Sequence, residues 1–262
     1  MRVRKHQPGV RRLSTLATTV APPSLLKRAL LALAAFRYRS AMRCAPSADR
    51  NKEPIRNLLN RYPPFSDPGA RASCIEIASG TGQHVGFFAR AYPHVVFQPT
   101  EYGGGSAGPE EPAYGQLEPV FASIIAHTGG LQNVKAPIEL DAGAATWPAD
   151  VEADAQKWDA VYACNICHIS PYQVTEGLLA GAGRVLKPAS GHLFIYGPFM
   201  VDGQHTAPSN EAFDQRLRGQ NAQWGVRDAT QLAQLATRFG LELVAREEMP
   251  ANNFVLVLRK AQ

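Results

Sequence analysis

The first 48 residues of this 262-residue chain contain no aspartate or glutamate. They carry ten lysines and arginines, whereas the remaining 214 residues hold 17 basic and 22 acidic side chains. The formal net charge of +5 therefore comes from the N-terminal segment, and the body is net acidic. A body that binds nucleic acid would need lysine and arginine clustered on its folded surface. We therefore expect no nucleic-acid partner.

An N-terminal segment that lacks acids and is rich in arginine, serine and threonine is typical of an organelle transit peptide. Its apolar run, residues 29–36, is shorter than the roughly 20 residues that cross a bilayer, and no later window approaches a membrane span. We interpret residues 1–48 as a disordered basic tail that directs the protein to a plastid or mitochondrion, and residues 49–262 as the folded domain. The alternative is that translation starts at Met42 and that the protein is cytoplasmic.

The chain has only four cysteines and no second cysteine pair at metal-binding spacing. Cys164, Cys167 and His168 spell the attachment pattern of c-type haem, but they directly follow a strand-like apolar run at residues 158–163. Zinc would need two further ligands. We therefore predict neither a metal site nor a disulfide framework, and interpret these cysteines as small buried residues at a strand end.

Strand-like and helix-like segments alternate along the body. The predicted strands are residues 73–78, 95–98, 136–140, 158–163, 191–196, 241–249 and 254–259, and the predicted helices are residues 84–92, 120–127, 173–186 and 229–239. This alternation is typical of an α/β protein with a mostly parallel sheet and helices on both faces. The last two strands are separated by four residues, which predicts an antiparallel hairpin at the edge.

One strand of the body ends in small residues and turns at once into a helix. Its sequence is Glu-Ile-Ala-Ser-Gly-Thr-Gly, residues 76–82, and such a turn lets the backbone approach a ligand at the helix N-terminus. Valine at position 85 replaces the third glycine of the dinucleotide fingerprint, and no lysine follows the glycines as in a P-loop. Glu101, 19 residues beyond Gly82 at the end of the next strand, is placed to accept hydrogen bonds from ribose hydroxyls. These features predict a nucleotide-like cofactor.

These residues, with Asp141 after a third strand, resemble the pattern of class I S-adenosylmethionine-dependent methyltransferases. More narrowly, the chain resembles the methyltransferase-like 26 family, once a domain of unknown function, from about Asp49 to Lys260. The matching segments are residues 50–55, 79–84, 133–137, 196–199 and 249–253. The resemblance implies a Rossmann-like, seven-stranded sheet and transfer of a methyl group from S-adenosylmethionine to an acceptor, which we expect to be a small molecule. Glu101 stands where the family pattern has aspartate, and residues 102–115 look inserted beside it.

The resemblance also implies roles for individual residues. The methionine half and backbone of the cofactor would be bound by Glu76, Ser79, Gly80 and Gly82, its ribose by Glu101, its adenine amine by Asp141, and its sulfonium would lie near Asn165. We expect a side chain at Gly82 to fill the space that the ligand needs, without disturbing the fold. The alternatives are that Asp141 caps a helix and that Asn165 is a turn residue.

The acceptor side offers polar residues that follow strand ends or lie in loops. We predict His168 and Tyr196 as catalytic residues and His205, Asn210, Asn252 and Asn253 as substrate-side residues. If His168 is the general base, activity should fall below about pH 6.5. The alternative is that His168 only caps its loop.

Two other classes of function remain open. A third glycine at the expected spacing would favour an oxidoreductase or other nucleotide-binding enzyme, and this chain lacks that glycine. A protein that keeps the fold without turnover is the second alternative, and the intact acidic set of Glu76, Glu101 and Asp141 argues against loss of the cofactor.

Overall fold

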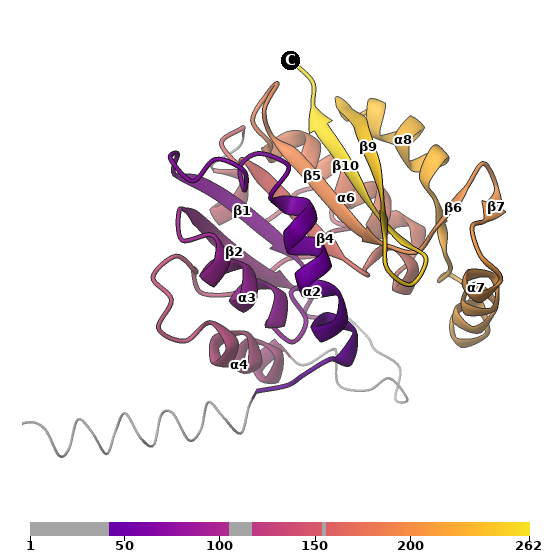
Figure 1. The fold of residues 1–262 in the computed structure, drawn as a ribbon, viewed down its shortest axis with the longest axis horizontal. Helices are drawn as coiled ribbons and strands as arrows, with labels where there is room; N and C mark the ends of the chain where they lie inside the picture. The colour runs from indigo at the N-terminus through magenta and orange to yellow at the C-terminus, as the bar shows by residue number, and fades with distance from the viewer. Residues whose placement is uncertain (1–41, 105–116, 154–155) are drawn as a thin grey trace, which may run out of the picture. The chain divides into compact units, whose positions relative to one another are not determined.

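The computed structural model describes residues 42–104, 117–153 and 156–262. A seven-stranded sheet forms its centre (Figure 1), in the order β3 (Ile138–Glu139), β2 (Val95–Glu101), β1 (Ala72–Ile77), β4 (Ala160–Cys164), β5 (His192–Gly197), β10 (Asn253–Lys260) and β9 (Leu241–Met249). Strands β1 to β5 of this sheet pair in parallel, and β10 is antiparallel to both of its neighbours. The predicted sheet and its antiparallel edge hairpin are therefore confirmed.

Helices cover both faces of this sheet, because its central strands are apolar on both sides. Helices α2 (Pro46–Leu59), α3 (Gln83–Ala91) and α4 (Leu117–Thr128) share one core with Cys74 and Tyr162. Helices α5 (Ala149–Glu152), α6 (Tyr172–Val185) and α8 (Ala229–Thr237) share the other core with Ile75 and Val161. Successive residues of β1 and β4 thus enter opposite cores, as the two-residue period of a strand requires.

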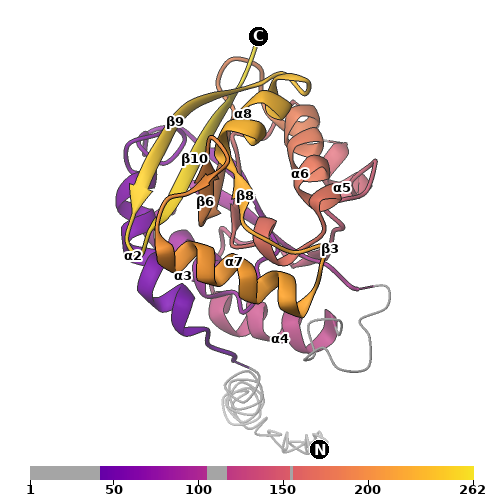
Figure 2. The same ribbon diagram turned by 90° about the vertical axis from the view of Figure 1, so that its right-hand side faces the viewer.

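A second, smaller group of elements follows β5. A three-stranded sheet has the order β7 (Gln204–His205), β6 (Phe199–Val201) and β8 (Arg227–Asp228), and helix α7 (Pro208–Gln220) lies between β7 and β8 in the chain. Figure 1 and Figure 2 show these elements gathered beside the end of the main sheet. A short 3-10 helix, η1 (Cys167–Ile169), follows β4. These segments provide the side chains that the parallel strands themselves lack.

Every predicted strand and helix is present, with ends shifted by a few residues, but sequence reasoning missed α2, α5, α7 and the three short strands β6 to β8. Helix α2 begins at Pro46, so the folded body starts before the boundary that we placed at Asp49; Ala48 is buried beside this helix's other inward residues. Residues 1–41 of the predicted transit-peptide tail (residues 1–48) lie outside the described part of the chain, as do residues 105–115 of the predicted insertion (residues 102–115). Within the described ranges, no helix combines the length and apolar character needed to cross a membrane.

Candidate cofactor and acceptor site

The turn between β1 and α3 has an unusual backbone. Ala78, Gly80 and Gly82 all have positive φ, at 54°, 55° and 84°, and the alanine among them adopts a conformation that residues with a side chain rarely take. The backbone N–H of Ser79 donates to the carbonyl of Thr100 at 2.8 Å, which ties the turn to β2. A Cβ atom at Gly80 would meet no atom of the described residues within 4 Å. The turn therefore presents its backbone at Gly80 to open space.

Gly82 has a different surrounding. A Cβ atom there would lie 2.6 Å from Cα of Ile124 on α4, so the missing side chain lets α3 and α4 approach each other. Our expectation that a side chain at Gly82 would fill ligand space and spare the fold is thus wrong, because helix packing already occupies that direction. Ser123 of α4 strengthens the same contact by donating from Oγ to the carbonyl of Thr81 at 2.8 Å.

Glu101 joins the end of β2 to this turn. Its Oε2 accepts the backbone N–H of Gly80 at 2.7 Å, and its Oε1 accepts the N–H of Tyr102 at 3.0 Å. Burial raises the pKa of Glu101, and the two backbone donors act in the opposite direction. Each oxygen keeps a lone pair for a second donor. The carboxylate can therefore accept hydrogen bonds from a diol while it holds the turn in place.

Glu76 lies deeper in the same region. Its side chain is 3% exposed, and within the described ranges its Oε2 has no hydrogen-bond partner. The pKa of Glu76 is raised to about 8, mainly by burial. The charge of Glu101 contributes to the rise, and a hydrogen bond from Ser79 opposes it. A buried carboxyl oxygen without a donor costs free energy in an apolar interior. This orphaned acceptor suits a ligand that brings its own donor.

The next two strands also end in predicted site residues. Asp141 follows β3 and is exposed, and its Oδ1 accepts the N–H of Gly143 at 2.8 Å in a local turn. Asn165 follows β4 with a φ of 60°, and its backbone N–H donates to the carbonyl of Tyr196 at 2.9 Å. Ligands of open α/β sheets bind at this carboxyl edge. The ends of the successive strands β1, β2, β3 and β4 thus carry the glycine turn, Glu101, Asp141 and Asn165, respectively.

A cavity of about 710 Å³ adjoins the end of β4. Its walls come from α2, the loop with η1, the end of β5, α7 and the β9–β10 turn. The lining residues are Ser47, Arg50, Asn51, Asn165, His168, Tyr196, Pro198, Ser209, Asn210, Phe213, Arg216, Pro250, Ala251, Asn252 and Asn253. This volume accommodates a small organic molecule.

Most predicted acceptor-side residues line this cavity, namely His168, Tyr196, Asn210, Asn252 and Asn253. His205 does not: its Nε2 lies 3.6 Å from Oδ2 of Asp214, which also accepts from Nε of Arg218 at 3.0 Å. The short strand β7 places the side chain of His205 toward α7, so the prediction of His205 as a substrate-side residue needs correction. Sequence reasoning gave no role to Arg50, Asn51, Phe213 and Arg216, which come from α2 and α7, the two long helices that it missed.

His168 is 5% exposed, and in the described structure neither of its ring nitrogens forms a hydrogen bond. Burial, together with the smaller effect of the charge of Arg227, lowers the pKa of His168 to about 4. Arg227 closes the loop instead, donating from Nε to the carbonyl of Cys167 at 2.9 Å and from Nη2 to that of Ser170 at 2.6 Å. The loop is therefore held without the imidazole, which stays neutral at physiological pH and free to accept a proton.

Asn51 connects α2 to the sheet and to α3. Its Oδ1 lies 2.7 Å from Nε2 of His84, and its Nδ2 donates to Sγ of Cys164 at 3.7 Å. Burial raises the pKa of Tyr196 to about 12, whereas Asn51 and the charge of Arg50 lower it. Tyr196 therefore remains protonated, and its hydroxyl can donate a hydrogen bond at the cavity wall.

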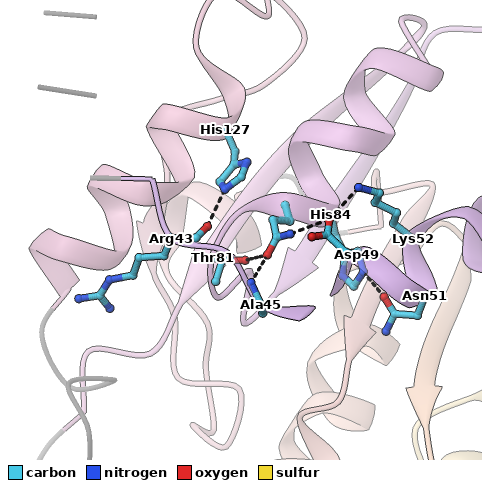
Figure 3. A network of polar contacts seen from close by, with 9 residues as sticks. Arg43, Ala45, Asp49, Asn51, Lys52, Thr81, His84 and His127 are labelled. Carbon is cyan, nitrogen blue, oxygen red and sulfur yellow. Dashed lines mark hydrogen bonds and ion pairs between the residues drawn. The ribbon is translucent and has the colours of Figure 1, made fainter. Parts of the chain in front are cut away.

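The residues before α2 are fixed over the N-terminal end of α3 and beside α4 (Figure 3). The N–H of Arg43 donates to Oγ of Ser123 at 2.9 Å, and its carbonyl lies 2.7 Å from Nε2 of His127. The N–H of Ala45 donates to Oε1 of Gln83, whose Nε2 reaches Asp49 at 3.0 Å. This network sets the position of α2, and with it one wall of the cavity.

A family model described as a protein of unknown function, DUF938, matches residues 42–260. This chain belongs to the DUF938 family. The match spans all of β1 to β10 and therefore covers both the turn after β1 and the cavity of this DUF938 protein.

Solved structures resemble this DUF938 chain in fold. An O-methyltransferase family protein from Burkholderia thailandensis has a TM-score of 0.62 and 17% identity over 82% of this chain and 58% of its own. Human N-acetylserotonin methyltransferase in complex with SAM has a TM-score of 0.60 and 13% identity, over 92% of this chain and 61% of its own. A putative O-methyltransferase from Nostoc punctiforme has a TM-score of 0.60 and 16% identity, over 82% of this chain and 57% of its own. The chain spans less than two thirds of the length of these proteins. At such identities they establish the Rossmann-like methyltransferase fold, which confirms the predicted fold class.

Proposed function

We propose that this DUF938 protein transfers a methyl group from S-adenosylmethionine to a small-molecule acceptor, and that its narrower kinship is with the methyltransferase-like 26 family. One observation carries the proposal. Glu101 accepts the N–H of Gly80 at a turn that is open to ligand, at the carboxyl edge of a methyltransferase-like sheet, and a cavity of about 710 Å³ begins at the end of β4. A binding site for a ribose-containing cofactor thus adjoins room for a second molecule.

The residues present fit S-adenosylmethionine. Glu76 offers an unpaired carboxyl oxygen to an ammonium group, Gly80 leaves the turn open, and Glu101 can accept from ribose hydroxyls. Ser79 and Gly82 shape the same turn, and Asp141 and Asn165 stand at the next strand ends. When bound, this cofactor supplies an electrophilic methyl group on a positively charged sulfur.

The chain's own residues orient the acceptor and handle its proton. The neutral imidazole of His168 faces the cavity and can take a proton from a hydroxyl, thiol or amine as that group attacks. Tyr196 stays protonated and can donate a hydrogen bond to the acceptor. Asn165, at the end of β4, lines the same cavity and is also the residue that we propose to lie near the sulfonium of the cofactor. Most of the rate enhancement then comes from proximity and orientation.

Calorimetric titration of the full chain with S-adenosylmethionine and with S-adenosylhomocysteine tests the proposal. Gly80→Asn keeps a residue that tolerates positive φ but places a side chain in the open space, so affinity should fall at least tenfold. Gly130→Asn is the matched control, because Gly130 also has positive φ, 83°, and open space, and lies after α4. Glu101→Gln, which removes the charge at constant size, should weaken binding by about tenfold.

Absence of binding by the wild type would overturn the proposed function. Equal loss of affinity in Gly80→Asn and Gly130→Asn would overturn the placement of the cofactor at this turn. Cofactor binding without transfer to any acceptor would favour the non-catalytic alternative for this fold.

A further inference from the structure

We propose that the cavity takes an acceptor with an anionic group, a carboxylate or a phosphate, which the guanidinium groups of Arg50 and Arg216 bind. This inference rests on the proposed function, because it names the substrate class of the same site. It starts from the charge of the cavity wall, which contains two arginines and no aspartate or glutamate. The body as a whole is net acidic, so this wall is opposite in sign to its surroundings.

The two arginines are not used for ion pairs in the described part of the chain. On α2, both carboxylates pair with other cations: Asp49 with Lys52 at 2.7 Å and Glu53 with Arg56 at 2.7 Å. On α7, Asp214 pairs with Arg218 at 3.0 Å, and Glu211 forms no ion pair among the described residues. Arg50 and Arg216 therefore present uncompensated positive charge to the cavity, whereas their helix neighbours do not.

Both arginines are linked to the residues that we assign to the reaction, Arg50 through its charge and Arg216 through Phe213. The charge of Arg50 acts on the Tyr196 hydroxyl, whose pKa it lowers against the larger effect of burial. The guanidinium of Arg216 lies 5.3 Å from the ring centre of Phe213, and that ring meets the imidazole of His168 edge to face at 5.4 Å. Arg50 on α2 and Arg216 on α7 thus belong to different walls of one cavity that also holds Tyr196 and His168.

Arginine suits this task better than any other side chain. Its planar guanidinium presents paired N–H donors that match the two oxygens of a carboxylate or phosphate. The cation–π contact with Phe213 attracts the guanidinium of Arg216 to the face of that ring. An acceptor held by its anionic group has its other end oriented by the neutral wall of asparagines, tyrosine and histidine. The charge would therefore select the acceptor, and the neutral wall would present its nucleophile.

The test uses full-length protein saturated with S-adenosylhomocysteine, whose own binding is measured first. Titration calorimetry then compares matched pairs of probes: benzoate with benzamide, 4-hydroxycinnamate with its primary amide, and phenyl phosphate with phenol. We expect the anions to bind at least tenfold more tightly than the neutral partners. A comparison of the affinity for phenyl phosphate with the affinities for the two carboxylates shows which kind of anion the cavity prefers.

Variants assign the effect to the two arginines. Arg50→Gln and Arg216→Gln should each weaken anion binding by about tenfold and leave the neutral probes unchanged. Arg56→Gln and Arg218→Gln are matched controls on the same two helices, outside the lining, and should leave anion affinity within about twofold. Arg216→Gln should also leave the affinity for S-adenosylhomocysteine unchanged.

Three results would overturn the inference. The first is equal binding of acids and amides, or no binding of any probe once S-adenosylhomocysteine is bound. The second is loss of S-adenosylhomocysteine affinity in Arg50→Gln without an effect of Arg216→Gln on the anions, which would assign Arg50 to the cofactor. The third is an equal loss in the control variants. Failure of the wild type to bind S-adenosylhomocysteine would instead count against the proposed function, and the anion pairs are then compared without it.

Discussion

Asn51 Oδ1 lies 2.7 Å from Nε2 of His84, and both side chains are buried, at 7% and 8% exposure. This contact joins helix α2, which walls the cavity, to helix α3, which begins at the proposed cofactor turn. Burial lowers the pKa of His84 to about 4, so the ring is neutral at physiological pH. A neutral, buried hydrogen bond thus joins the two halves of the site, in addition to the contact between Gln83 and Asp49.

Asn51→Ala should lower the free energy of unfolding by roughly 1–3 kcal/mol, because it leaves a buried ring nitrogen of His84 without a partner. Urea denaturation of the full chain measures this loss. Lys52→Ala, which removes an exposed ion pair from the same helix, is the control and should leave the midpoint nearly unchanged. An Asn51→Ala protein as stable as wild type would show that the contact does not hold α2 in place.

His168→Ala should reduce turnover by about a hundredfold or more with little change in cofactor affinity. The assay uses whichever acceptor the binding experiments identify. Because burial holds the pKa of His168 near 4, the base stays neutral well below pH 6.5. We therefore correct the earlier expectation of a fall in activity below pH 6.5: the loss due to this group should set in near pH 4. An NMR titration of the imidazole with a midpoint near 6.5 would contradict this.

The same group contributes to the pH dependence of stability. Its pKa is about 4 in the folded protein and about 6.5 in the unfolded chain. Between those values the unfolded state binds more protons, so stability falls as the pH drops from about 6.5 to 4. Glu76, with its raised pKa, acts in the opposite direction, so the comparison must be with a variant. The stability of wild type relative to His168→Gln should decrease by roughly 1–2 kcal/mol between pH 7.5 and pH 5, measured by urea unfolding.

Gly82→Val should destabilise the protein, because its side chain would meet the backbone of Ile124 and its φ is 84°. The free energy of unfolding should fall by roughly 1–3 kcal/mol or more, which urea denaturation measures as a lower midpoint. Gly80→Asn, which has open space, should retain stability and lose cofactor binding. A Gly82→Val protein that folds normally and fails only to bind S-adenosylhomocysteine would restore our first interpretation of this glycine.

Arg227→Gln should alter His168 without removing it. Arg227 lowers the pKa of His168 and holds the carbonyls on either side of it. The substitution should therefore raise the pKa of His168 in an NMR titration and lower kcat more than it changes cofactor affinity. Arg227→Lys keeps the charge but loses the paired donors, so it should keep the pKa low while the loop loosens. An unchanged pKa in Arg227→Gln would show that Arg227 supports only the backbone.

The position of the predicted cofactor residues along one edge of the sheet could be predicted from sequence because the signals are local. Strand β1, the glycine turn, α3 and Glu101 follow each other within 30 residues, and small residues after an apolar run have few structural interpretations. The parallel sheet then brings Asp141 and Asn165 to the same edge. None of this required knowledge of distant contacts.

The acceptor side could not be predicted in the same way. Helix α7 turns Asn210, Asp214 and Leu217 inward, so two of its three buried residues are polar and the apolar periodicity that identifies a helix is missing. Helix α2 has an apolar face but contains Pro54 in its interior, and proline argues against a helix in sequence. His205 looked equivalent to Asn210 in sequence, and only its contact with Asp214 distinguishes them.

Helix α7 and the β9–β10 turn brace each other through Asn210, whose Nδ2 donates to the carbonyl of Asn252 at 2.9 Å, and through the Asn252 amide, which donates to Ser209 at 3.1 Å. Neither α7 nor the β9–β10 turn contains any of the residues that we propose to bind the cofactor. Under the proposed function, substitutions at the cavity-lining positions of α7, such as Phe213 and Arg216, would change the acceptor side of the site without touching the residues proposed to bind the cofactor. Divergence within DUF938 should concentrate on this helix.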